Sequence, residues 1–140
     1  MSWRDDARCN ERRASLARRG AVMAPLFYCT VPGVPVPQSR ARTTKNGTFY
    51  SARSTAHRHE LAWRFKEAYA PRQTGSAVSI LIEVAGMRAD SDLDNHAKMV
   101  LDALVDACVL ARDDVTVVRE LVVRVVSGEP RTAVTVTAHG

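Results

Sequence analysis

The sequence predicts a single α+β domain, with a mixed β-sheet and two main helices in the order β-α-β-α-β-β. The length of 140 residues is that of one ordinary domain. Four runs rich in β-branched residues alternate with two segments whose apolar residues recur at helical spacing. No internal repeat or low-complexity block interrupts this pattern.

The first strand is expected over residues 26–31. It is closed by residues 32–37, whose prolines lack the N–H group that a central strand requires. Further along, Asn46-Gly47 is a two-residue turn signal between basic and aromatic residues. This signal predicts a small exposed hairpin.

The first helix is expected over about residues 54–69. Ser54 or Thr55 can cap its start, and a proline follows its end. Leu61 and Phe65 lie four residues apart, so they share one face of the helix. We expect this face to be buried.

The second half of the chain predicts a strand, a helix and two further strands. Residues 77–87 alternate apolar and polar side chains and are the candidate for the central strand. Residues 95–108 have the spacing of a helix with one buried stripe. That stripe contains Ala97, Val100, Leu101, Leu104 and Cys108. Residues 115–126 and 131–138 are β-branched runs joined by 127–130, a connection typical of an antiparallel hairpin.

Residues 1–22 are interpreted as a basic tail and residues 23–140 as the folded domain. The tail holds six Arg together with acidic residues, unlike a secretory signal or an acid-free transit peptide. No stretch approaches the roughly 18 apolar residues of a membrane helix. Three widely spaced cysteines fit reduced thiols. We therefore expect a cytoplasmic protein with no membrane partner.

The charges are distributed unevenly along the chain. Residues 38–72 carry a net charge of +6, whereas residues 88–114 carry a net charge of −4. A basic segment attracts a polyanion such as nucleic acid, and an acidic concentration repels one unless cations neutralise it. Both together indicate metal-dependent chemistry on a polyanion.

The acidic segment begins with Asp90, Asp92 and Asp94, which alternate at the end of the expected central strand. If the extended conformation persists, their carboxylates project from one face. Two negative charges about 4 Å apart repel by roughly 1 kcal/mol even in water. Oxygen ligands with incomplete protein coordination suit Mg²⁺, so this cluster is a candidate metal site.

A simpler interpretation is that Asp92 or Asp94 only caps the following helix. On that helix Asn95, Lys98 and Asp102 share the polar face. Lys98 either forms a helix salt bridge or binds the scissile phosphate and stabilises charge in the transition state. The sequence leaves both alternatives open.

A second acidic pair, Asp113-Asp114, precedes the next strand. We expect the chain to return there to the sheet edge that carries Asp92 and Asp94. One member of the pair would then supply a third ligand.

The pattern D-L-D-N-x-x-K, then D-A-L, then D-D before a valine-rich strand, resembles the RusA family of Holliday junction resolvases. The segment V-P-G-x-P-x-P-x-S-R-A-R at residues 31–42 is similar to the family's segment after its first strand. The resemblance covers about residues 26–138. Two departures are Cys108, where similar sequences have a helix-closing glycine, and Ser91, where a basic residue can stand.

The resemblance implies a structure-selective endonuclease that cuts four-way DNA junctions as a homodimer, with Mg²⁺ as cofactor and Mn²⁺ able to substitute. It assigns Asp92, Asp94 and Asp114 as metal-binding and catalytic carboxylates and Lys98 as the essential cation. Asp113 is a neighbour that could assist or replace Asp114. A left-handed helix cap at Cys108 would be mildly strained.

Basic residues of the loop and first helix are the candidates for contacts to DNA phosphates. They are Arg40, Arg42, Lys45, Arg53 and Arg58. Two other functions fit the same residues. One is a nuclease of this fold acting on other branched DNA, and the other is a DNA-binding protein without catalysis, in which the carboxylates are caps and ion-pair partners.

Overall fold

The computed structural model describes residues 25–68 and 76–139. The elements in chain order are β1 (Phe27–Pro32), β2 (Arg42–Thr44), β3 (Gly47–Phe49), α2 (Ala52–Ala68), β4 (Val78–Ala85), α3 (Leu93–Asp106), β5 (Val118–Val125) and β6 (Arg131–Ala138). The predicted α+β class, with a mixed sheet and two main helices, is confirmed. The expected tail over residues 1–22 and the expected end of the first helix at Tyr69 lie outside the described residues.

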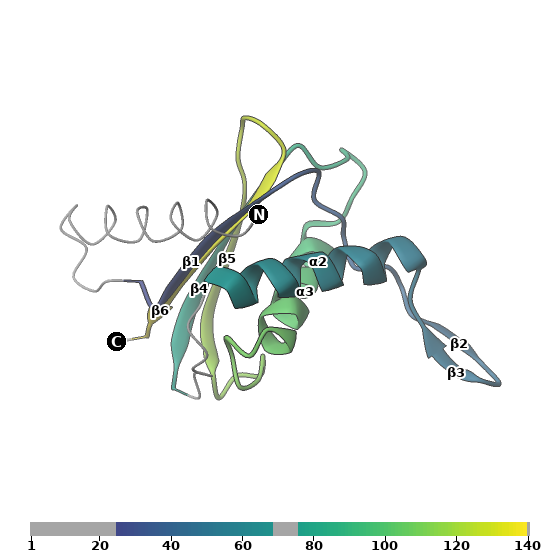
Figure 1. Cartoon of the computed structure of the whole chain (residues 1–140), viewed down its shortest axis with the longest axis horizontal. Helices are drawn as coiled ribbons and strands as arrows, with labels where there is room; N and C mark the ends of the chain where they lie inside the picture. Colours follow the sequence, from purple (N-terminus) through teal and green to yellow (C-terminus); the bar gives the residue numbers. More distant parts are fainter. Residues whose placement is uncertain (1–24, 69–75, 140) are drawn as a thin grey trace.

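The main sheet has four strands in the order β1-β6-β4-β5. Strand β4 pairs antiparallel with β6 and parallel with β5, so it is an interior strand as predicted. Both helices lie on the same side of this sheet (Figure 1). The predicted hairpin is confirmed as the separate β2–β3 sheet, which extends away from the body of the protein beyond the start of α2 (Figure 1).

The expected hairpin between the last two strands is wrong. Strand β6 lies between β1 and β4, and β5 pairs with β4 on the outer edge. The reason is burial: Ala133, Val134 and Val136 of β6 are at most 5% exposed. Strand β5 carries three charged residues and remains largely exposed, as suits a sheet edge.

The core forms between the helix-facing side of the sheet and the two helices. Alternate residues of β4, from Val78 to Val84, are at most 1% exposed, as the period of two predicts. Phe27 of β1 meets Phe65 of α2 edge to face, with ring centroids 5.6 Å apart. Among the described residues, no helix is both long and apolar enough to cross a membrane.

The N-cap of helix α2 lies three residues before Ser54, the first of the two predicted caps. The Ser51 hydroxyl accepts the Ser54 backbone N–H at 3.1 Å, which makes Ser51 the N-cap. Ser54 is instead buried, and its hydroxyl accepts the Ser39 N–H at 3.2 Å. The Ser39 hydroxyl in turn accepts the Ser51 N–H at 2.9 Å. These three serines fix the proline-rich loop to the start of α2.

Helix α3 ends in the left-handed cap expected at Cys108, whose φ is +61°. The Cys108 N–H donates to Val105 and the Val109 N–H donates to Leu104, both at 3.0 Å. This pattern is a Schellman motif, in which glycine is usual. Cys108 is exposed rather than part of the buried stripe, because it lies beyond the last helical turn.

Candidate active site

The loop between β4 and α3, residues 86–92, carries the first candidate carboxylates. It leaves β4 at Gly86, whose φ is +75° and whose backbone lies against Pro130. At the far end of the loop, Ser91 donates to the Arg88 carbonyl oxygen from its N–H (3.1 Å) and from its hydroxyl (2.6 Å). The loop is thus held at its first residue and at the residue before the helix cap.

His96 is buried beneath this loop. Although it is polar and lies in the first half of α3, His96 is only 2% exposed. Its Nε2 lies 3.0 Å from the Ser91 hydroxyl oxygen. Since the Ser91 proton is directed at a carbonyl oxygen, the hydroxyl accepts a hydrogen bond from Nε2–H. Burial lowers the pKa of His96, which favours the neutral ring in this position.

Asp92 is the N-cap residue of α3, but its carboxylate makes no capping hydrogen bond. The backbone carbonyl of Asp92 accepts the N–H groups of Asn95 and His96 instead. The only hydrogen bond of the Asp92 carboxylate to a described residue comes from the Asn95 side-chain amide, at 3.5 Å. Asp94 lies in the first turn, is exposed, and has no hydrogen bond or ion pair to any described residue. Both carboxylates are therefore open to a ligand from solution.

Asp90, Asp92 and Asp94 do not lie in one extended segment, as their alternation in the sequence had suggested. Asp90 lies in a turn and forms an ion pair with Arg88, whose Nε is 3.3 Å from Oδ1. Asp94 already belongs to the helix. The three carboxylates consequently do not project from one face of a strand. Only Asp92 and Asp94 share the start of α3.

Lys98 lies one turn after Asp94 and is exposed, but no ion pair of 4 Å or less joins it to a carboxylate of the described residues. Its charge acts on Asp102 further along α3. Burial raises the pKa of Asp102, the charges of Arg58 and Lys98 lower it, and the charge of Asp113 raises it. Positive and negative side chains thus lie close to one another on the polar side of α3.

Asp114 precedes β5 and shapes the turn that leads into it. Its carboxylate accepts the Thr116 N–H at 3.0 Å and also the Thr116 hydroxyl. These two hydrogen bonds lower the pKa of Asp114. Its backbone carbonyl accepts the N–H groups of Val117 and Val118. Because this turn occupies residues 114–117, β5 begins later than the predicted position 115.

The expectation that Asp114 returns to the sheet edge of Asp92 and Asp94 is wrong within one chain. Strands β4 and β5 are parallel, so the start of β5 lies beside the start of β4, where the Val78 N–H donates to the Val117 carbonyl at 2.7 Å. Asp92 follows the opposite end of β4. The 14 residues of α3, which separate the two places, span about 21 Å. Among residues 25–68 and 76–139, no three His, Cys, Asp or Glu side chains lie close enough to hold a metal ion.

The five basic residues proposed to contact DNA fall into two groups. Arg40, Arg42, Lys45 and Arg53 are exposed in the loop, the hairpin and the first turn of α2. Arg58 instead donates two hydrogen bonds to Asp106 of α3, at 2.6 and 2.9 Å, and these bonds raise the pKa of Arg58. Its guanidinium also lies 3.8 Å from Asp102. Arg58 thus joins the two helices.

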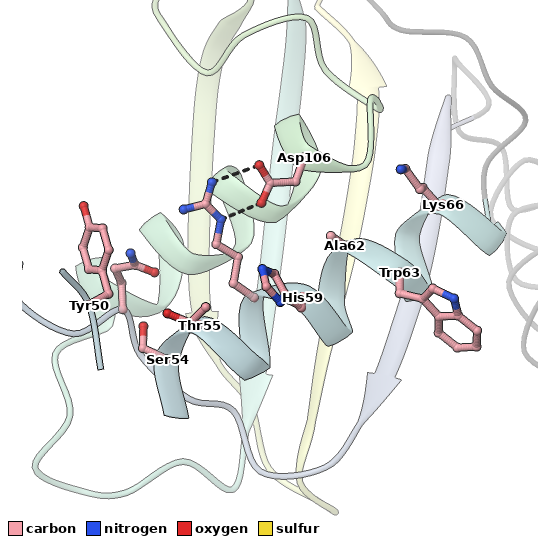
Figure 2. A pocket seen from close by; sticks show the side chains of 10 residues that line it. Tyr50, Ser54, Thr55, His59, Ala62, Trp63, Lys66 and Asp106 are labelled. Carbon is pink, nitrogen blue, oxygen red and sulfur yellow. Dashed lines mark hydrogen bonds and ion pairs between the residues drawn. The ribbon is translucent and has the colours of Figure 1, made fainter. Parts of the chain in front are cut away.

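A groove of about 550 Å³ along α2 was not predicted from the sequence. Residues of α2 spaced three or four apart form one wall, and residues of the preceding loop and of α3 close it (Figure 2). Its lining includes Gln38, Tyr50, Thr55, His59, Trp63 and Lys66. In the sequence, the only sign of this groove is that its lining residues on α2 recur three or four positions apart.

Comparison with known proteins gives one family. The model of the family described as endodeoxyribonuclease RusA matches residues 32–137, which is most of the chain. No curated protein matches the sequence. The family match includes every described carboxylate and basic residue discussed above.

Proposed function

The chain belongs to the RusA family of endodeoxyribonucleases, and from this premise we propose that it is a cytoplasmic enzyme that resolves Holliday junctions by Mg²⁺-dependent phosphodiester hydrolysis. The observation that carries the proposal is the state of Asp92. This residue occupies the capping position of α3 without a capping hydrogen bond. A carboxylate needed only for the helix would make that bond.

Asp92 and Asp94 would hold the metal ion, either Mg²⁺ or Mn²⁺. Their exposed oxygens fit a hard cation that keeps part of its water shell. Such an ion, when bound, polarises a phosphate oxygen and lowers the pKa of a bound water. Lys98, one helical turn further on, would bind a phosphate oxygen and stabilise the negative charge that develops on it.

The neutral His96 would act on the same reaction from beneath the loop. It donates to Ser91, the residue directly before Asp92, and so fixes the backbone from which that carboxylate projects. This is a positioning role, because His96 is buried. The energetic reason is that a preformed ligand loop avoids the entropic cost of ordering it around the ion.

The position of Asp114 supports a homodimer. Within one chain this carboxylate is separated from Asp92 and Asp94 by the length of α3, so the third ligand would come from Asp114 of the partner subunit. Asp113 is the alternative ligand, since the Asp114 carboxylate already accepts two hydrogen bonds from Thr116. A dimer also suits a four-way junction, whose near two-fold symmetry requires paired nicks in two strands.

The proposal is tested by incubating the protein with a synthetic four-way junction, a flap and a linear duplex, each with Mg²⁺ or with EDTA. We expect cleavage of the junction with Mg²⁺ only, and loss of cleavage in Asp94→Asn. The matched control is Asp90→Asn, a neighbouring carboxylate that is paired with Arg88, and it should keep its activity. Cleavage in EDTA, or an active Asp94→Asn protein, contradicts the mechanism. Preferential cleavage of the flap identifies a nuclease for other branched DNA, and metal-independent binding without cleavage identifies a non-catalytic DNA-binding protein.

Shared sites are tested by mixing two inactive variants, Asp94→Asn and Asp114→Asn. If each site uses Asp94 of one subunit and Asp114 of the other, a mixed dimer has one intact site. We then expect the mixture to nick one strand, whereas each variant alone does not. If both residues act within the same chain, every site in the mixture is defective and no nick appears.

A further inference from the structure

The groove along α2 is lined by aromatic, basic and amide side chains. Thr55, His59, Trp63 and Lys66 lie at helical spacing on one stripe of α2. Tyr50 stands near the start of the helix, and Trp63 and Lys66 lie toward its far end (Figure 2). The groove volume of about 550 Å³ is within the range of ligand sites, roughly 300–1,000 Å³.

Gln38 contributes an unsatisfied polar atom to this groove. The residue is 4% exposed, and its side-chain oxygen is buried without a hydrogen-bond partner among the described residues. Leaving such an acceptor unpaired destabilises a protein. A ligand that offers an N–H donor would satisfy it.

The charge of the groove favours an anion. The carboxylate of Asp106 is neutralised by the two hydrogen bonds from Arg58. Lys66 is exposed and has no carboxylate of the described residues within 4 Å. Exposed Arg53 precedes the groove on α2. Asp106 is the only carboxylate among the described residues that line the groove, so a strand of phosphates could follow the groove without meeting an unpaired negative charge in its lining.

The groove begins beside the candidate active site. The backbone N–H of Gln38 donates to the carbonyl of Asn95 at 3.0 Å, and Asn95 directly follows Asp94. The unsatisfied oxygen thus belongs to a residue that is attached to the first turn of α3. If a phosphate is bound at Asp94, the neighbouring nucleotide would lie beside this groove.

From these observations we infer that the groove binds unpaired nucleotides of the DNA next to the cut site, with bases stacked on Tyr50 and Trp63 and a base N–H donated to Gln38. Tyr50 and Trp63 are 39% and 48% exposed as residues, so both are accessible to a base. Unpaired bases expose both their faces and their hydrogen-bonding edges, whereas paired and stacked bases do not. The inference rests on the proposed nuclease function for its biological meaning.

The test uses the fluorescence of Trp63. The chain has two tryptophans, so the full-length Trp3→Phe protein reports on Trp63 alone. It is titrated in EDTA, where no cleavage is expected, with a single-stranded tetranucleotide and with a blunt duplex of the same composition. We expect saturable quenching by the single strand and none by the duplex at equal nucleotide concentration.

Variants of the lining distinguish the groove from the rest of the surface. Tyr50→Ala should weaken binding of the tetranucleotide by about 5- to 150-fold, the usual effect of losing one stacking partner. Gln38→Met, which keeps the side-chain length and removes the unsatisfied oxygen, should weaken binding without lowering the melting temperature. The matched control is Phe49→Ala, an aromatic residue that is 50% exposed and outside the groove. It should bind as the parent protein does.

The inference is overturned if the tetranucleotide does not quench Trp63, if the duplex quenches it equally, or if Tyr50→Ala and Gln38→Met both bind normally. These results are independent of the nuclease assay. Junction cleavage with no quenching rejects the groove and retains the enzyme. Quenching with no cleavage under any metal condition retains the groove and rejects the proposed catalysis.

Discussion

Substitution of Gly86 by alanine should be among the most destabilising single changes in this protein. Gly86 directly follows β4 and has a φ of +75°. A Cβ placed there would lie 2.6 Å from Cγ and 2.8 Å from both Cα and Cβ of Pro130. Because one of these atoms belongs to the backbone, a side-chain rotation cannot remove the overlap.

The expected loss follows from two contributions. A left-handed conformation costs a residue with a Cβ roughly 1–2 kcal/mol, and an overlap in a packed region costs typically about 1–3 kcal/mol. The sum is about 2–5 kcal/mol, out of a total stability of roughly 5–15 kcal/mol for a domain. With an m value of roughly 2 kcal/mol/M, the midpoint of urea unfolding should fall by about 1–2.5 M.

The control is Gly47→Ala in the β2–β3 turn. Gly47 has a φ of +120°, but nothing lies within 4 Å of its added Cβ. It therefore carries a conformational cost without the overlap, so its loss should be clearly smaller than that of Gly86→Ala. Equal midpoints for the two variants, measured by circular dichroism in urea, would refute the argument from Pro130.

Three further results are expected. Cys108→Gly should stabilise the protein by about 1 kcal/mol by relieving the left-handed cap, seen as a melting temperature higher by about 2–4 °C; an unchanged value contradicts this. Burial lowers the pKa of His57 below its ordinary 6.5, so the unfolded chain binds more protons near that pH and stability should fall as the pH drops through about 6.5. His57→Gln should reduce this dependence in urea titrations at several pH values. Replacing both Arg40 and Arg42 by alanine should make the negative slope of log affinity against log salt shallower by about 2. Arg58→Ala, which removes an ion-paired guanidinium, should change this slope less.

The fold class was predictable because β-branched runs and helical spacing report local structure directly. The position of β6 was not, because a short connection such as residues 127–130 is compatible with a hairpin and with separated strands. The distribution of charged residues between the last two strands indicates which of them is buried. Strand β5 contains Arg119, Glu120 and Arg124, whereas residues 132–138 have none, and an uncharged strand can be buried between two neighbours.

The candidate site was predictable only where its residues are close in sequence. Asp92 and Asp94 share the start of α3, as their spacing before a helical pattern indicates. The separation of Asp114 depends on the parallel pairing of β5 with β4, which is a property of the whole sheet. Gln38 meets Asn95 through a backbone hydrogen bond across 57 positions of sequence, and no local pattern predicts such a contact.

The place of β6 also determines when this protein can fold. The sheet is continuous only when β6 separates β1 from β4, and β6 follows the other three strands of this sheet in sequence. During synthesis, β1 and β4 therefore emerge from the ribosome without the neighbour that pairs with both. Their exposed edges must wait for residues 131–138, which places this long-range step after the synthesis of those residues. The sheet, and the loop that Pro130 contacts, cannot be completed before residues 131–138 have been made.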